Sequence, residues 1–220
     1  MHRVLPRLGT WAALSLALVV LATAVPARAG CGPPNGPWVD PDSGEELLGT
    51  PAPAWKFTRW LGPPQSLDRL RGKVVLLRWW NTGCHFCETT LPEVEALRTR
   101  YGRDGFVAIG VFHPKPPRPV RDAEVRRAAL ERGFHGPVAI DQNWEMLSRY
   151  WLAGNPDRNW TSVSFLIDRD GRIAWVHGGG EYHHSSDPAH ARCAAKADEL
   201  DAAIRRALGR GVSTTSVATP

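Results

Sequence analysis

Two cysteines separated by two residues, Cys84 and Cys87, have the types and spacing best suited to chemistry in this chain. They lie in the segment NTGCHFCETTLPEVEAL, after an apolar run and at the start of a helical pattern. A thiol at a helix N-terminus is close to the positive end of the helix dipole, which stabilises its thiolate. Cys84 would then attack a disulfide and Cys87 would resolve the mixed disulfide, while the reverse reaction oxidises a substrate. A structural disulfide and half of a metal site are the other interpretations of this spacing.

The elements around these cysteines alternate between strands and helices. Apolar runs predict buried strands, and a period of 3.6 residues predicts helices. The expected order is a strand at 73–80, a helix at 84–101, a strand at 105–112, a helix at 120–132, a short strand at 137–140, a helix at 142–151, a hairpin at 162–177 and a closing helix at 187–208. The early alternation predicts parallel pairing and the late hairpin an antiparallel addition. We therefore expect an α/β fold with a mixed central sheet and helices on both faces.

The N-terminus has the pattern of an export signal. Arg3 and Arg7 precede an uncharged apolar stretch at residues 11–25, and small residues then surround a cleavage site at Ala29. We expect residues 1–29 to be a cleaved signal peptide and the protein to be periplasmic or otherwise exported. The apolar stretch is short for a membrane span, so membrane association is expected only if the signal is retained. In an oxidising compartment, cysteines are expected as disulfides or as redox groups.

The rest of the chain divides into three expected parts. Residues 30–50 are rich in Gly and Pro and predict an extended leader, residues 51–208 hold the predicted elements of one domain, and residues 209–220 predict a flexible tail. The whole chain has a net charge of +5, but residues 1–29 hold three arginines and no acid, which leaves +2 on the remainder. Without a dense run of Lys or Arg there, nucleic acid is not an expected partner.

Two segments, LRGKVVLLRWWNTGCHFCETTLPEVEAL and SVSFLIDRDGRIAWVHGGGEY, together resemble the thioredoxin-like superfamily. The resemblance is to exported bacterial thiol–disulfide oxidoreductases of the redoxin or TlpA-like type, and it covers about residues 48–208. Pro92 follows Cys87 at the spacing found in thioredoxins, and the second segment is similar to the family's sheet hairpin. The resemblance implies a three-layer fold and redox-active Cys84 and Cys87. Protein thiols or disulfides would be the substrates, a redox partner protein would supply or accept electrons, and no bound cofactor is implied. We expect a monomer.

Three positions depart from the thioredoxin pattern. Ser162, preceded by Thr161, stands where the family usually has a cis-proline facing the disulfide. Arg78 stands where thioredoxins have a buried acid that takes the proton of the resolving cysteine. Arginine cannot act as that base, but it would favour a thiolate if it points toward the thiols. Gly83 replaces the tryptophan that thioredoxins have directly before the first cysteine.

Several residues near the cysteines are candidates for substrate binding or for tuning the thiols. His85 would favour the thiolate of Cys84 when protonated, and a solvent-facing side chain without a role is the alternative. Apolar side chains provide a possible docking surface for a peptide, although neighbouring strand residues point to opposite faces and at least one tryptophan of Trp79 and Trp80 must pack in the core. Trp160 is a further apolar candidate. The set expected to bind or tune comprises His85, Phe86, Trp80, Thr161 and Ser162.

The remaining cysteines, Cys31 and Cys193, leave one possible additional disulfide. Such a bridge would pin the leader to the closing helix, but Cys193 also falls on an apolar stripe and suits a plain buried cysteine. The segment HGGGEYHHSSDPAHARC contains residue types that suit zinc or copper: His177, His183, His184, His190 and Cys193. Their spacing matches no defined site, so we expect no metal there.

Three alternatives use the same fold. A copper or other metal chaperone would bind its ion through the same cysteines and nearby histidines such as His113. A redox-inactive thioredoxin-like domain would serve only in binding. A peroxidase of the superfamily would need a threonine three residues before a lone cysteine, whereas Thr82 stands two before Cys84. We therefore expect a thiol–disulfide oxidoreductase in which Cys84 is the nucleophile and Cys87 the resolving thiol.

Overall fold

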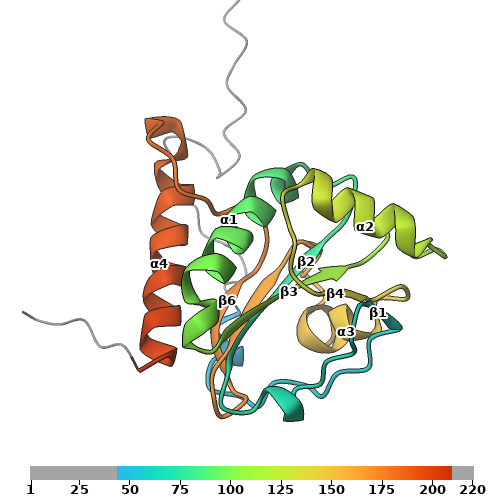
Figure 1. Cartoon of the computed structure of the whole chain (residues 1–220), viewed down its shortest axis with the longest axis horizontal. Helices are drawn as coiled ribbons and strands as arrows, with labels where there is room; N and C mark the ends of the chain where they lie inside the picture. The colour runs from blue at the N-terminus through green and yellow to red at the C-terminus, as the bar shows by residue number, and fades with distance from the viewer. Residues whose placement is uncertain (1–43, 210–220) are drawn as a thin grey trace, which may run out of the picture.

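The centre of the fold is a sheet of six strands (Figure 1). The structure is a computed structural model that describes residues 44–209; the expected signal peptide, residues 30–43 of the leader and residues 210–220 lie outside this range. The strands follow the order β1-β4-β3-β2-β5-β6 across the sheet. They are β1 (Arg59–Leu61), β2 (Val74–Trp80), β3 (Phe106–Phe112), β4 (Val138–Ile140), β5 (Ser164–Ile167) and β6 (Ile173–His177). Within the described range, no helix is both long and apolar enough to cross a bilayer.

The sheet combines parallel and antiparallel pairing. Strands β2, β3 and β4 run parallel to one another, whereas β1, β5 and β6 each pair antiparallel with their neighbours. The parallel strands are connected by α1 (His85–Tyr101) and α2 (Asp122–Glu131), because parallel neighbours need a crossover. The β5–β6 turn places Gly171 at a φ of 77°, which glycine adopts without steric cost. The mixed sheet expected from the sequence is confirmed.

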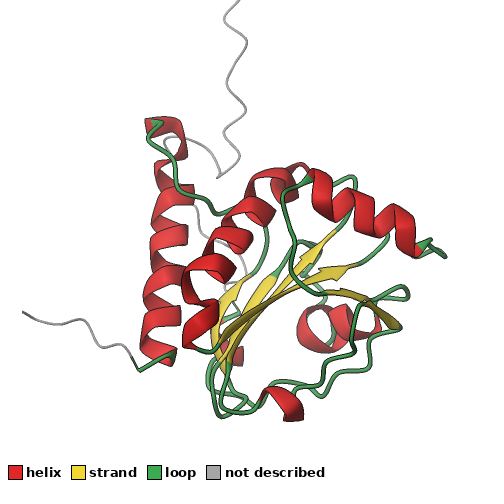
Figure 2. Cartoon of the chain, in the orientation of Figure 1, coloured by secondary structure: helices red, strands yellow, loops and turns green. Residues whose placement is uncertain are grey.

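Two apolar cores lie on the two faces of the sheet. Side chains alternate along β2, so that Leu76 and Trp80 join one core while Leu77 and Trp79 join the other. Helices α1, α2 and α4 (Ala191–Ala207) contribute to the first core, and α3 (Glu145–Leu147) with the π-helical turn η4 (Ser148–Leu152) contributes to the second. Burying a large apolar side chain stabilises a fold by roughly 1.5–3 kcal/mol. Because β2 contributes such side chains to both cores, it stabilises the packing of helices on both faces of the sheet. Figure 2 shows the sheet between helices, and the three-layer α/β fold is confirmed.

The structure adds detail that the sequence pattern did not provide. Strand β1 was not expected, and it pairs with β4 at the edge of the sheet. The expected helix at 142–151 is divided into α3 and η4. The remaining short 3₁₀ helices are η1 (Glu45–Leu47), η2 (Asp68–Leu70), η3 (Gly102–Asp104) and η5 (Pro188–His190). Because η5 leads directly into α4, the closing helix begins as a tighter turn.

Residues 44–50, at the end of the expected leader, pack against β6. The Gly49 N–H donates to the Ile173 carbonyl at 2.8 Å, and the Ile173 N–H donates to the Thr50 carbonyl at 2.9 Å. Glu46 also forms an ion pair with Arg158. These contacts attach residues 44–50 to the folded unit.

Candidate active site

The candidate active site lies where β2 meets α1. Strand β2 ends at Trp80, and the Asn81 side-chain oxygen then accepts a hydrogen bond from the Gly83 N–H at 3.0 Å, which closes a tight turn. Cys84 is the N-cap residue of α1, and the Cys87 N–H donates to the Cys84 carbonyl at 3.1 Å. The two cysteines form a disulfide within the first turn of the helix. Unpaired N–H groups and the helix dipole at this end favour a thiolate in the reduced form.

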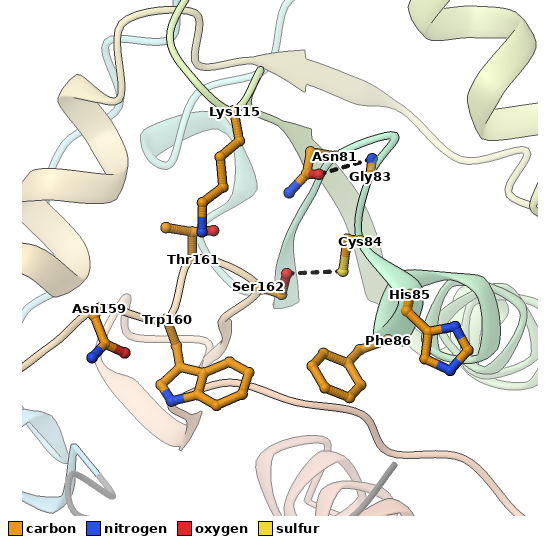
Figure 3. A pocket seen from close by; sticks show the side chains of 10 residues that line it. All are labelled: Asn81, Gly83, Cys84, His85, Phe86, Lys115, Asn159, Trp160, Thr161 and Ser162. Atoms are coloured by element: carbon orange, nitrogen blue, oxygen red, sulfur yellow. Dashed lines mark hydrogen bonds between the residues drawn. The ribbon is translucent and has the colours of Figure 1, made fainter. Parts of the chain in front are cut away.

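The two sulfur-bearing residues differ in access to solvent. Cys84 is 8% exposed and lines a pocket of about 430 Å³, whereas Cys87 is fully buried. Figure 3 shows the pocket, whose walls come from Asn81, residues 83–86, Lys115 and residues 159–162. An incoming thiolate therefore has a path to Cys84 and none to Cys87.

Ser162 lies directly against the disulfide. Its hydroxyl oxygen is 3.0 Å from the Cys84 sulfur and 3.6 Å from the Cys87 sulfur. The sheet fixes the position of Ser162. Strand β5 pairs with β2 so that Ser164 lies opposite Arg78, and Ser162 precedes Ser164 by two residues. A hydroxyl can donate to a thiolate, so Ser162 supplies a hydrogen-bond donor where the family usually has a proline.

Arg78 holds the two loops beside the disulfide. It is fully buried, and its Nη1 donates to the Ser162 carbonyl at 2.7 Å while its Nη2 donates to the Gly180 carbonyl at 3.0 Å. The guanidinium also lies 5.4 Å from the centre of the Tyr182 ring. Burial lowers the pKa of Arg78, and the fields of Tyr182 and Glu181 oppose this shift. Because its donors are directed to backbone carbonyls, Arg78 clamps the loops and does not act as a base.

Phe86 and Trp160 form the apolar part of the pocket. Their ring centroids are 5.7 Å apart, and both side chains border the opening below Cys84 and Ser162 (Figure 3). Trp160 is 38% exposed, which leaves part of its ring available to a bound peptide.

Trp80 does not line the pocket, contrary to the sequence-based expectation. It is fully buried and packs edge-on against Phe112, with ring centroids 4.9 Å apart. Trp79 is also fully buried, on the opposite face of the sheet. Both tryptophans belong to β2, whose two faces are covered by helices, so alternation along the strand leaves neither one exposed.

His85 and Thr161 line the pocket at its two sides. The His85 side chain is 66% exposed, and its Nδ1 lies 3.8 Å from the Glu88 carboxylate. Its ring extends outward in Figure 3, away from Ser162. Thr161 is buried beside Ser162 and contributes to the wall of the pocket.

Lys115 and Asn159 line the pocket but were not identified from the sequence. Lys115 follows β3, whose C-terminal end lies beside that of β2 because the two strands are parallel. Figure 3 shows its side chain extending toward Thr161. A polar residue just after a parallel strand often reaches a site at that edge of the sheet, and this signal could have found Lys115. Asn159 lies in a loop without such a signal.

The described residues place the cysteine pair outside the one group of possible metal ligands. Neither Cys84 nor Cys87 belongs to a group of three or more potential ligands. His113 is fully buried next to Asn81, with 3.4 Å between the His113 Nε2 and the Asn81 Nδ2. Burial, with a contribution from Lys115, lowers the pKa of His113 to about 3.

Cys193 is fully buried and is not a free thiol. Its expected partner Cys31 lies outside the described residues, so the bridge between them stays a prediction.

Comparison with known proteins gives consistent results. The sequence matches the Redoxin family over residues 47–192. It is 30% identical over 132 residues to the thiol-disulfide oxidoreductase ResA of Bacillus thuringiensis (strain Al Hakam), a match that covers 60% of this chain and 70% of ResA. It is also 30% identical over 143 residues to protein DipZ of Mycobacterium bovis, covering 63% of this chain but 20% of DipZ, so the chain spans only about a fifth of that relative.

A solved structure supports the same fold. The crystal structure of a thioredoxin-family thiol:disulfide interchange protein from Chlorobium tepidum TLS superposes with a TM-score of 0.54 at 21% identity, covering 73% of this chain and 97% of the other. The family match extends over more than half of the chain and includes the disulfide at the start of α1. The chain therefore belongs to the redoxin family, and it has the fold of the thioredoxin-family structure.

Proposed function

We propose that this protein is exported and exchanges its Cys84–Cys87 disulfide with thiols of other proteins, with Cys84 as the reacting cysteine and Cys87 as the resolving one. The observation that carries the proposal is a disulfide at a helix N-terminus with one accessible sulfur-bearing residue. Cys84 borders the pocket and Cys87 is fully buried, which supports this division of roles.

The oxidising direction needs two successive exchanges. A substrate thiolate attacks the Cys84 sulfur, the Cys84–Cys87 bond breaks, and Cys87 leaves as a thiolate. A second substrate thiolate then attacks the substrate sulfur of the mixed disulfide and releases Cys84 as a thiolate. The substrate thereby forms a disulfide, and the protein takes up two electrons and, on protonation, becomes a dithiol. In the reducing direction, Cys84 attacks a substrate disulfide and Cys87 then attacks Cys84 to release the reduced substrate.

The surroundings of Cys84 assist both directions. Ser162 can donate to the Cys84 thiolate, which it already contacts as a disulfide sulfur at 3.0 Å. Phe86 and Trp160 offer an apolar rim on which a peptide carrying the reacting cysteine docks. Aromatic rims of this kind provide large contact area at low entropic cost. Lys115 adds a positive charge to the same pocket, which favours an acidic peptide segment.

Export and partners form the rest of the proposal. The apolar stretch at residues 11–25 and the small residues around Ala29 support a cleaved signal, so the substrates are proteins of an oxidising compartment. A second redox protein restores the resting state, and the protein acts as a monomer. A metal chaperone that uses the same cysteines is less well supported, since no described histidine or carboxylate completes a ligand group with them.

The test is a redox titration of the mature protein beginning at Gly30. The protein is equilibrated with glutathione buffers of graded ratio, its thiols are trapped by alkylation, and the peptides are analysed by mass spectrometry. We expect a reversible two-electron transition confined to Cys84 and Cys87. A pair that stays oxidised in every buffer would identify a structural disulfide and a redox-inactive domain.

Single variants test the order of attack. Cys87→Ser leaves Cys84 without a resolving thiol, so a mixed disulfide with glutathione should accumulate on Cys84. Cys84→Ser leaves only the buried thiol, so little mixed disulfide should form. The opposite pattern, with glutathione accumulating on Cys87, would reverse the proposed roles.

A further inference from the structure

A group of possible metal ligands lies on the segment between β6 and α4, apart from the disulfide. It contains Glu181, His183 and His190, with Cys193 in the first turn of α4. One candidate ligand atom from each residue lies within 4.8 Å of those of all the others. The segment folds back on itself, so that the rings of His183 and His190 come to 5.0 Å between centroids. The folding back of this segment brings together possible metal ligands whose spacing in the sequence does not predict a site.

His183 has the hydrogen bonding of a metal-binding histidine. Its Nδ1 lies 3.2 Å from the carbonyl oxygen of His184, and a carbonyl only accepts, so the ring proton belongs on Nδ1. The Nε2 then carries a lone pair. This nitrogen is buried, has no hydrogen-bond partner, and lies 3.8 Å from the nearer Glu181 carboxylate oxygen. A hydrogen bond from the remote nitrogen to a carbonyl is the arrangement found for most metal-ligating histidines.

Glu181 is oriented toward His183 by a neighbour on α1. The Thr89 hydroxyl donates to the Glu181 Oε2 at 2.5 Å, and a carboxylate has capacity for further interactions through its two oxygens. The Glu181 side chain is only 2% exposed, and a buried carboxylate needs compensating positive charge. Arg78 supplies part of that compensation through its electrostatic interaction with Glu181.

The spacing of these groups suits a small transition-metal ion. Zinc binds nitrogen and oxygen ligands at about 2.0–2.2 Å, which in a tetrahedral site places ligand atoms about 3.3–3.6 Å apart. The 3.8 Å between the His183 Nε2 and the Glu181 Oε2 is close to that separation. Shifts of about 1 Å in the side chains would bring the remaining ligand atoms to the same distance. His183 and His190 are only half-buried, so an ion can reach the group from solvent.

We propose that Glu181, His183 and His190 bind a divalent transition-metal ion such as Zn²⁺. Two imidazoles and one carboxylate with a water in the remaining position are a common ligand set for this ion. Cys193 is not part of the set, because it is not a free thiol and a disulfide sulfur offers no thiolate. The ion would tie the segment after β6 to η5 and the N-cap of α4, a helix that lies beside α1 in Figure 1. The site is separate from the exchange reaction proposed for Cys84.

The experiment uses the mature protein in its fully oxidised form. Absence of titratable thiols is verified first, so that Cys84 and Cys87 cannot contribute ligands. After removal of metal with a chelator, ZnCl₂ is titrated by calorimetry and the melting temperature is followed. We expect one Zn²⁺ per chain and a melting temperature that rises with Zn²⁺ concentration, because an ion that binds only the folded state stabilises it. Co²⁺ in place of Zn²⁺ should give visible absorption without a thiolate charge-transfer band.

Four variants assign the ligands. His183→Ala, His190→Ala and Glu181→Gln should each weaken Zn²⁺ binding at least tenfold and reduce the Zn²⁺-dependent rise in melting temperature. His184→Ala is the matched control, because His184 is the neighbouring histidine but its ring contacts Glu93 and Asp198 instead. It should bind Zn²⁺ as the unaltered protein does. Circular dichroism without metal verifies folding, and the half-buried His190 provides the assignment if a change at the buried Glu181 prevents folding.

Two results would overturn the metal site. One is the absence of any Zn²⁺-dependent change in heat or melting temperature in the oxidised protein. The other is unchanged binding in both histidine variants, which would place the ion elsewhere. Neither result bears on the redox titration of Cys84 and Cys87, so the two proposals fail or stand separately.

Discussion

The Ser162 hydroxyl oxygen lies 3.0 Å from the Cys84 sulfur, at the position where thioredoxin-like proteins usually have a proline. A proline offers neither a hydroxyl nor a backbone N–H, whereas serine brings a hydrogen-bond donor to the Cys84 sulfur. The same oxygen is 3.6 Å from the Cys87 sulfur. In the reduced state, we expect the Ser162 hydroxyl to donate a hydrogen bond to whichever of Cys84 and Cys87 is the thiolate.

Replacing Ser162 with alanine should make the thiolate of reduced Cys84 harder to form. A hydrogen bond to a charged group is worth about 1.5–3 kcal/mol, and about 1.4 kcal/mol corresponds to one pH unit, so the midpoint of Cys84 alkylation should move up by about one to two pH units. The measurement is the rate of iodoacetamide alkylation of Cys84 against pH, resolved by mass spectrometry. Thr161→Val is the matched control, because it removes a neighbouring hydroxyl that does not contact the sulfur; an equal shift in that variant would remove the role given to Ser162.

Replacing Arg78 with methionine should affect both stability and the site. The change leaves the buried carbonyls of Ser162 and Gly180 without their donor, which should lower the free energy of unfolding by about 3 kcal/mol. Because Ser162 is then held less firmly, the alkylation midpoint of Cys84 should also rise. Urea unfolding measures the first effect and the alkylation profile the second.

One further substitution at Arg78 separates its charge from its geometry, and one at Arg127 serves as a surface control. Arg78→Lys keeps the positive charge but loses the planar fork that serves two carbonyls, so most of the loss should persist. Arg127→Met changes an arginine that is 73% exposed and pairs with Glu131 at the surface, and it should cost less than about 0.5 kcal/mol. A stability loss in Arg78→Met no larger than in Arg127→Met would show that the clamp is unimportant.

Much of the fold follows from local pattern. The apolar runs of β2 and β3 are long enough to be identified as buried strands, and the turn at Gly171 marks the β5–β6 hairpin. Strand β1 escaped prediction because three residues are too few to display an alternation, and its pairing with β4 is decided by tertiary contact. A single helix was expected over residues 142–151, but the chain passes from an α-helical turn to a wider π-helical turn at Ser148.

The sequence predicted site residues only where a reactive or polar residue stands at the end of a recognisable strand or helix. Cys84, Cys87 and Ser162 stand at positions fixed by the β2–α1 junction and the start of β5, and the structure brings them together. The prediction that Trp80 borders the pocket was wrong, since Trp80 is fully buried. The apolar sequence of β2 does not reveal that helices cover both faces of this strand. Lys115 was missed because a single charged residue in a loop has no periodic pattern, and its place just after the parallel strand β3 was the available signal.

Removing the aromatic rim should weaken substrate docking without changing the redox couple. Trp160→Ala and Phe86→Ala should each raise the KM for a cysteine-containing peptide, by roughly threefold to tenfold, since an aromatic pair contributes about 0.5–1.5 kcal/mol beyond its buried area. The redox midpoint measured with glutathione should stay unchanged, because neither ring contacts a sulfur through a hydrogen bond. Steady-state kinetics and the glutathione titration give the two readouts.

Leu130→Ala is the matched control for the rim. Leu130 is an apolar residue that is 50% exposed on α2 and does not line the pocket. The KM of the Leu130→Ala variant should equal that of the unaltered protein. In the double variant, the two aromatic substitutions should be less than additive, because each ring is the other's neighbour. Full additivity would mean that Phe86 and Trp160 bind the peptide independently.

Two buried histidines should make the protein less stable in mild acid. Burial lowers the pKa of His177 to about 3, with contributions from Arg78 and Lys196, and burial lowers that of His113 to the same value. An unfolded histidine titrates near 6.5, so between about pH 6.5 and 3 the unfolded chain binds more protons than the folded one. Stability is therefore complete above the unfolded value and is lost as the pH falls through this range.

Replacing His177 with glutamine should reduce that pH dependence. One histidine of this kind contributes a slope of about 1.4 kcal/mol per pH unit to the free energy of unfolding, so the variant should lose stability less steeply between pH 6 and 4.5 by about that amount. The measurement is urea unfolding at half-unit steps of pH, with the slope as the readout, because the absolute stability at pH 7.5 also reflects the packing of His177 on Trp175. His85→Gln is the matched control for loss of an imidazole, because the His85 side chain is 66% exposed. An equal change of slope in that variant would remove the role given to burial of His177. If the His177 variant and the unaltered protein have the same slope, the protein takes up a proton at His177 without unfolding, and acid instability must come from His113 or from carboxylates. Glu95 is one such carboxylate: burial raises its pKa, but its bonds with Arg98 and the His135 N–H outweigh burial and lower the pKa.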